Sequence, residues 1–152
     1  MDALPEILLI EDNKDDRDLF ELALKSSGLR AVVAHAGGVA EVVKRLQRQG
    51  AHLQRQYPVV VVLDLDLPDL DGITLLRYVR RDILPVHIPV VVLTGSQRER
   101  DRAVCEAMGV EDYLVKPTVY ADLVSFVSSL QRYLPGGAAS NGTTSRVAQR
   151  RL

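Results

Sequence analysis

Side chains that can do chemistry follow short apolar runs at four places in this 152-residue sequence. Glu11 and Asp12 follow the run ILLI, and Asp64 follows VVVVL. Thr94 follows VVVL, and Lys116 follows YLV. If these runs are parallel strands, their carboxyl ends meet at one edge of a sheet, where ligands of open α/β sheets bind. The sequence therefore predicts one polar site that contains all of these side chains.

The carboxylates of Glu11, Asp12 and Asp64 cannot all stay ionised at one edge without compensating positive charge. Mg²⁺, or the similar Mn²⁺, takes oxygen ligands of this kind, and the Lys116 ammonium adds a further positive charge. Such a site suits phosphoryl transfer, in which a protein mainly positions groups and neutralises phosphoryl oxygens. A carboxylate can act as the nucleophile, so Asp64 would become an aspartyl phosphate.

Strands and helices alternate along the chain, which is the pattern of a parallel sheet with helices on both faces. The run Val59 to Leu63 is too short for a helix and has no polar face, so it predicts a strand buried on both sides. We expect further strands at 6–11, 31–36, 88–94 and 112–116. We expect helices from about residue 13 to Gly28, and at 39–46, 73–82, 97–108 and 118–134. Residues 47–57 could extend the second helix or form a loop.

Length and composition predict one domain, followed from Pro135 by a disordered tail rich in Gly, Ser, Thr and Asn. A net charge of −1 without a basic stripe argues against nucleic acid and against a charged membrane surface as partners. We expect no signal peptide and no membrane span, because the longest apolar runs are far below ~20 residues. A cytoplasmic protein is expected; the single cysteine, Cys105, is unremarkable for such a protein, although a single thiol also occurs in secreted chains.

The spacing of the polar residues resembles the receiver domain of two-component response regulators. That family combines an acidic pair, a phosphoacceptor Asp, a Ser or Thr, and a Lys-Pro, here Glu11-Asp12, Asp64, Thr94 and Lys116-Pro117. Pro68 and Gly72 also stand at the family's distances after Asp64. The resemblance covers about residues 5–134 and implies a receiver domain over 1–134. It implies a doubly wound (βα)5 flavodoxin-like α/β fold, with a five-stranded parallel sheet in the order 2-1-3-4-5.

The resemblance also implies metal and phosphoryl chemistry for single residues. Asp64 would accept a phosphoryl group from the phosphohistidine of a partner histidine kinase. Asp12 would bind Mg²⁺ directly, Glu11 would bind it through water, and the backbone carbonyl of Asp66 would be the third protein ligand. The Asp66 side chain could rival Asp64 as acceptor, but the four-residue spacing from Asp64 to Pro68 favours Asp64.

The same resemblance implies roles for four further residues. Thr94 and Lys116 would each bind a phosphoryl oxygen, and Gly95 would leave room for the phosphoryl group. Tyr113 stands at the position of an aromatic side chain that changes rotamer on phosphorylation.

The implied function is a single-domain regulator that signals by phosphorylation-dependent protein contacts and is not an enzyme beyond its own Mg²⁺-dependent phosphorylation and dephosphorylation. The chain most resembles small stand-alone regulators that serve phytochrome-type histidine kinases. This narrower resemblance rests on the motif EDN at 11–13, the long segment before Val59 and the sequence DLDLPDLDG at 64–72. Two alternatives stay open: a phosphorelay shuttle without its own output, and a haloacid-dehalogenase-like phosphatase. The phosphatase fits less well, because it needs an acidic motif after the lysine, where only Asp122 remains.

Two last expectations concern geometry at the end of the chain. We expect a cis peptide bond before Pro117, because Lys116 must turn back over the site. We expect a core stripe on the last helix formed by Val119, Leu123, Phe126, Leu130 and Leu134. Tyr120, Val124 and Val127 add apolar area beside it, which predicts a homodimer through the fourth helix, fifth strand and fifth helix. Alternatively, these three residues only widen the core stripe.

Overall fold

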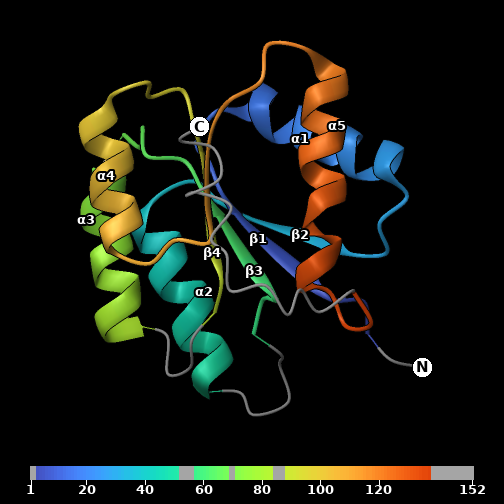
Figure 1. The fold of residues 1–152 in the computed structure, drawn as a ribbon. Helices are drawn as coiled ribbons and strands as arrows, with labels where there is room; N and C mark the ends of the chain where they lie inside the picture. The colour runs from blue at the N-terminus through green and yellow to red at the C-terminus, as the bar shows by residue number, and fades with distance from the viewer. Residues whose placement is uncertain (1–2, 52–56, 69–70, 84–87, 138–152) are drawn as a thin grey trace.

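A single parallel sheet with helices on both faces forms the centre of the molecule (Figure 1). The computed structural model describes residues 3–51, 57–68, 71–83 and 88–137. The strand order is β2-β1-β3-β4-β5, which confirms the predicted flavodoxin-like α/β fold. All neighbouring strands pair in parallel, and their bounds are β1 (Glu6–Ile10), β2 (Val32–Ala36), β3 (Val60–Leu63), β4 (Val90–Thr94) and β5 (Asp112–Val115).

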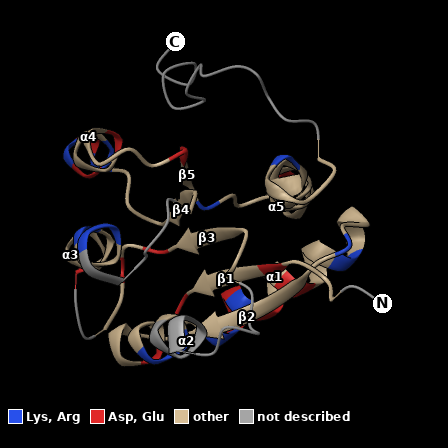
Figure 2. Cartoon of the chain, turned by 90° about the horizontal axis from the view of Figure 1, so that it is seen from below, with Lys and Arg blue, Asp and Glu red and all other residues tan. Residues whose placement is uncertain are grey.

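The described helices alternate with these strands as predicted: α1 (Lys14–Ser27), α2 (Val39–Ala51), α3 (Gly72–Tyr78), α4 (Glu99–Ala107) and α5 (Tyr120–Ser129). A π-helical segment, Val79–Ile83, continues α3, and a 3₁₀ segment, Leu130–Tyr133, continues α5. Residues 47–51 extend α2 rather than forming a loop. Helices α1 and α5 cover one face of the sheet, and α2, α3 and α4 cover the other (Figures 1 and 2).

Strand residues alternate between two apolar clusters, because successive side chains of a strand point to opposite faces. In β1, Leu8 and Ile10 pack with residues of α2, α3 and α4, whereas Ile7 and Leu9 pack with residues of α1 and α5. All residues of β3 and β4 are buried. Each fully buried Val, Leu or Ile stabilises the fold by about 1.5–3 kcal/mol. Packing on both faces therefore fixes the carboxyl ends of the strands.

The ends of α1 follow the sequence signals closely. Asn13 is the N-cap, and its Oδ1 accepts a hydrogen bond from the Asp16 backbone N–H at 3.0 Å. Gly28 ends the helix in the left-handed region, with φ of 75°. That conformation favours glycine because it has no Cβ. Asp71 caps α3, and its Oδ1 accepts a hydrogen bond from the Ile73 N–H at 3.4 Å.

The apolar residues of α5 bear on the choice between a dimer face and a wider core stripe. Val127 is 0% exposed and Val124 is partly buried against the same cluster, so both belong to the core. Tyr120 is 40% exposed, but its hydroxyl lies 2.8 Å from Ser26 Oγ of α1. Val124 and Val127 therefore widen the core stripe, which was the predicted alternative, because α1 packs beside α5 and covers the second row. Their burial removes apolar area on which the dimer was argued, and the dimer itself stays a prediction.

One residue of the predicted core stripe lies outside it. Val119 is 55% exposed, because α5 starts only at Tyr120 and Val119 has extended backbone. Helical spacing therefore does not apply to Val119. Phe126, Leu130 and Leu134 are buried as predicted.

Two other expectations, on a membrane span and on the tail, can be compared with the structure only within the described residues. None of the helices in the described ranges is long and apolar enough to cross a bilayer. The predicted disordered tail lies outside the described residues from 138 onward, and residues 135–137 form a turn after the 3₁₀ segment.

Candidate functional site

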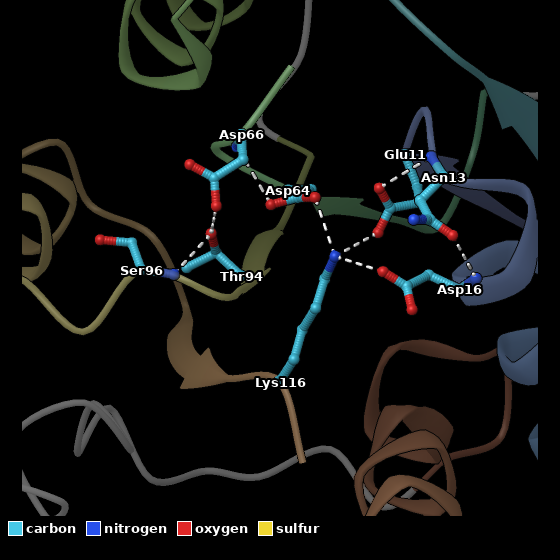
Figure 3. A network of polar contacts seen from close by, with 8 residues as sticks. All are labelled: Glu11, Asn13, Asp16, Asp64, Asp66, Thr94, Ser96 and Lys116. Atoms are coloured by element: carbon cyan, nitrogen blue, oxygen red, sulfur yellow. Dashed lines mark hydrogen bonds and ion pairs between the residues drawn. The ribbon is translucent and has the colours of Figure 1, made fainter. Parts of the chain in front are cut away.

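The register of the sheet brings the predicted polar residues together at its carboxyl edge (Figure 3). The Asp64 backbone N–H donates to the Ile10 carbonyl at 3.0 Å, which places Asp64 beside Glu11. The Lys116 N–H donates to the Thr94 carbonyl at 2.7 Å, which joins the ends of β5 and β4. Residues far apart in the sequence therefore share one site.

Three carboxylates form the acidic part of this site. Oxygen atoms of Glu11, Asp12 and Asp64 lie within 4.8 Å of one another. Glu11 and Asp64 are each 3% exposed, whereas Asp12 is exposed to solvent. Hard divalent cations prefer such closely spaced oxygen ligands and keep waters on their open side. The donor set therefore fits the predicted Mg²⁺ or Mn²⁺.

Lys116 supplies the positive charge of the site. Its Nζ lies 2.6 Å from Glu11 Oε1, 2.7 Å from Asp16 Oδ2 and 2.9 Å from Asp64 Oδ2. Burial alone would lower the pKa of Lys116, but the hydrogen bonds to these three carboxylates outweigh it and raise that pKa. The ammonium therefore stays charged and holds the carboxylates together.

The peptide bond between Lys116 and Pro117 is trans, so the predicted cis bond is wrong. The prediction assumed that a trans bond would direct the ammonium away from Asp64. Instead, the backbone bond to Thr94 fixes the start of the side chain, and its long stem reaches Asp64 from there.

Thr94 ends β4, Gly95 follows it, and both lie beside the Asp66 side chain. Thr94 is fully buried, and its Oγ1 lies 3.5 Å from Asp66 Oδ2 and accepts from the Ser96 N–H at 3.3 Å. A Cβ added at Gly95 would lie 3.7 Å from Asp66 Oδ2, which is an ordinary van der Waals contact. The role of Gly95 in leaving room for a phosphoryl group stays a prediction.

Asp64 and Asp66 have different surroundings. The Asp66 N–H donates to Asp64 Oδ1 at 3.1 Å, while Asp64 Oδ2 pairs with Lys116. The Asp66 side chain is directed toward Thr94 (Figure 3). Both oxygens of Asp64 are thus held by donors, which orients its carboxylate toward the site.

Tyr113 is connected to the site through Ser96. Its ring is buried, with the Arg102 guanidinium 4.9 Å from the ring centroid. Its hydroxyl donates to the Ser96 carbonyl at 3.3 Å, and the Ser96 N–H bonds to Thr94. Burial raises the pKa of Tyr113, so the hydroxyl remains a donor. Hydrogen bonds of Ser96 therefore connect Thr94 with Tyr113.

Sequence reasoning missed the roles of two residues. Asp16 is not among the predicted site residues, but its side chain pairs with Lys116. Its position in the first turn of α1, four residues after Asp12, was the available signal, since side chains of a helix lean toward its N-terminus. Ser96, two residues after Thr94, connects Thr94 with Tyr113.

Glu11 gives a prediction for the pH dependence of the metal-free protein. Burial raises the pKa of Glu11 from 4.5 to about 7, and the nearby Asp64 adds to this although Lys116 opposes it. A raised pKa means that the folded state binds the proton more tightly than the unfolded state. We expect its contribution, about 3 kcal/mol, to be present below pH 4.5 and lost as pH rises to about 7.

Urea unfolding at several pH values, with EDTA present, measures this contribution as the difference between wild type and Glu11→Gln. The Glu11→Gln protein should lose less stability between pH 4.5 and pH 7 than wild type. Glu99→Gln, at an exposed residue of α4, is the control and should keep the wild-type slope. Equal slopes for wild type and Glu11→Gln would contradict the prediction.

Comparison with known proteins identifies this arrangement. A model of the response regulator receiver domain matches residues 7–128. The chain belongs to the response regulator receiver family. As a receiver domain it is a phosphoacceptor of two-component signalling rather than a classical enzyme. This family replaces the haloacid-dehalogenase-like alternative.

Individual proteins similar to this receiver domain are known from sequence and from structure. SphR of Synechococcus elongatus, an alkaline phosphatase synthesis transcriptional regulatory protein, is 35% identical over 126 residues. That alignment covers 83% of this chain and 48% of SphR, so the chain spans about half the length of this relative. The structure of the phosphorylated cyanobacterial phytochrome response regulator RcpA is 30% identical, with a TM-score of 0.75. The alignment covers 98% of the RcpA chain and 93% of this chain.

A second structure, the Mn²⁺-bound form of response regulator Rcp1, is 32% identical to this receiver domain with a TM-score of 0.70. The alignment covers 86% of this chain and 99% of Rcp1. The cluster of Glu11, Asp12 and Asp64 is typical of the metal site of receiver domains.

Proposed function

We propose that this receiver domain accepts a phosphoryl group on Asp64 from the phosphohistidine of a histidine kinase and signals through phosphorylation-dependent protein contacts. The observation that carries the proposal is the environment of Asp64. Its buried carboxylate lies at the end of β3, 2.9 Å from the Lys116 ammonium and within the acidic cluster.

The reaction is a transfer between two nucleophiles. A carboxylate oxygen of Asp64 attacks the phosphorus, a P–O bond forms as the P–N bond to the histidine breaks, and the released imidazole takes a proton from solvent. Lys116 would donate a hydrogen bond to a phosphoryl oxygen, and Thr94 would donate another from its hydroxyl. Mg²⁺, held when bound by Asp12, Asp64 and the Asp66 carbonyl, with Glu11 acting through water, would neutralise the phosphoryl oxygens.

Asp64 is a better acceptor than Asp66 on three grounds. Its carboxylate belongs to the acidic cluster, it pairs with Lys116, and its second oxygen is oriented by the Asp66 N–H. The Asp66 side chain instead lies next to Thr94 and is exposed. Its negative charge would border the phosphoryl group rather than receive it.

The signalling partner and the form of output also belong to this proposal. RcpA is named as a phytochrome response regulator, and 98% of its chain is covered by the alignment with this chain. This supports a stand-alone regulator paired with a phytochrome-type histidine kinase over a phosphorelay shuttle. Tyr113 would transmit phosphorylation to the α4 and β5 surface, since Ser96 joins it to Thr94.

Labelling with acetyl phosphate and Mg²⁺ tests the proposal directly. After borohydride trapping, tandem mass spectrometry should find the label on Asp64. Asp64→Asn should abolish the label, because an amide is a poor nucleophile, whereas Asp66→Asn should keep it. Label retained in full on Asp64→Asn, or found on Asp66 in the wild type, would overturn the assignment. Sustained hydrolysis of p-nitrophenyl phosphate would instead indicate a phosphatase.

A further inference from the structure

We infer that Asp16 is a positioning residue, which holds the Lys116 ammonium in place for the phosphoryl group. This inference rests on the proposed function of Asp64 and assigns a role to a residue outside the acidic cluster. Asp16 Oδ2 lies 2.7 Å from Lys116 Nζ, and the two residues come from the first turn of α1 and the end of β5 (Figure 3).

The three contacts of Lys116 are not equivalent. A lysine ammonium has three N–H donors, and in this site they face Glu11, Asp64 and Asp16. Glu11 and Asp64 belong to the acidic cluster that fits a divalent cation, and Asp64 is also the proposed phosphoacceptor. Metal binding and phosphorylation therefore change two of the contacts of Lys116. The contact with Asp16 is the one that neither event uses.

The position of Asp16 is itself well fixed. Its backbone N–H donates to Asn13 Oδ1 at 3.0 Å, so the N-cap holds the first turn of α1. Asp16 and Lys116 border a small hollow of about 60 Å³, whose apolar wall includes Leu19, Phe20 and Leu123. Apolar surroundings on one side strengthen the ion pair relative to one in water.

An anchor of this kind matters because lysine has a long stem with many rotamers. Without Asp16, the ammonium would lose its partner on the α1 side as soon as the metal and the phosphoryl group occupy the other two carboxylates. Lys116 would then have to be ordered during phosphorylation. Asp16 removes that cost by holding the ammonium beforehand.

Asp15 provides a matched control for the charge of Asp16. Both are acidic residues in the first turn of α1, and changing either to asparagine removes one negative charge. Asp15 is exposed, whereas Asp16 contacts Lys116. An effect of the helix dipole or of net charge should appear in both variants. An effect of the contact with Lys116 should appear only in Asp16→Asn.

The affinity for beryllofluoride, a phosphoryl mimic, measured by ¹⁹F NMR with Mg²⁺, tests this role. Asp16→Asn should weaken binding roughly five- to tenfold, and Asp15→Asn should bind like wild type. In a Lys116→Met background, Asp16→Asn should have no further effect. In the metal-free protein, the ¹⁵N signal of the Lys116 ammonium, one of four lysines in the chain, should broaden in Asp16→Asn but not in Asp15→Asn.

The results separate the two proposals. If the wild type does not bind beryllofluoride, the proposed function fails, and the role of Asp16 fails with it. If the wild type binds but Asp16→Asn binds equally or more tightly, the proposed function stands and the positioning role is wrong. An equal loss in Asp15→Asn, or a loss that persists without Lys116, also overturns it.

Discussion

Gly72→Ala is expected to disrupt both the stability of the fold and the phosphorylation site. A Cβ at this position would lie 2.4 Å from Leu65 Cα and 2.9 Å from the carbonyl oxygens of Asp64 and Leu65. These are backbone atoms, so no side-chain rotation relieves the contact. We expect the free energy of unfolding to fall by about 3 kcal/mol or more. Urea unfolding measures this loss.

The same substitution should reduce labelling by acetyl phosphate. The Gly72 N–H donates to the Leu65 carbonyl at 3.0 Å, which ties the start of α3 to the loop that follows Asp64. Separating the two segments displaces Asp64, and a misplacement of about 1 Å lowers the rate roughly 100-fold. Gly37→Ala is the control, since its Cβ would meet nothing closer than 3.8 Å. Wild-type stability and labelling in Gly72→Ala would contradict the packing seen here.

Gly72 shows which part of the structure the sequence predicts and which part it does not. Its distance from Asp64 was recognisable as part of the receiver pattern, but the reason for a glycine there is visible only in the contact with Leu65. Likewise, the apolar runs that end in Asp64 and Thr94 predicted which residues meet at the sheet edge. The strand order came from the family resemblance, because periodicity does not determine which strands are neighbours.

The errors have physical causes of a different kind. Val127 was placed on a dimer face, with a wider core stripe as the alternative, because helical spacing gives the centre of a core stripe but not its width, which packing by α1 decides. The bond before Pro117 was predicted cis without knowing that Lys116 is anchored to Thr94. Asp16 was missed because its partner Lys116, directly after β5, is 100 residues away in the sequence.

Lys116→Met is the second substitution with a large expected effect. It removes the cation that faces Glu11, Asp16 and Asp64, and two of these carboxylates are almost fully buried. Removing one partner of a buried ion pair leaves uncompensated charge. We expect a loss of about 3 kcal/mol in the free energy of unfolding at pH 8 without Mg²⁺. Urea unfolding in EDTA measures it.

Lys14→Met is the matched control, because Lys14 makes an equally short contact, 2.8 Å to Asp18, on the surface. The side chains of Lys14 and Asp18 are largely exposed, at 77% and 58%. Exposed ion pairs are screened by water and salt, so we expect no measurable change in stability. Similar effects of the two substitutions would mean that the pairs of Lys116 are screened to the same degree as a surface pair.

Two conditions should restore the stability of Lys116→Met, and they identify charge as the cause of its loss. Mg²⁺ should stabilise the variant more than the wild type, because a cation at the acidic cluster takes over the compensation that the ammonium provided. Lowering the pH to about 6 should also raise the free energy of unfolding of Lys116→Met. Lys116 lowers the pKa of Glu11, so its removal lets Glu11 take up a proton more readily. A loss that neither Mg²⁺ nor acid reduces would instead point to packing of the lysine stem.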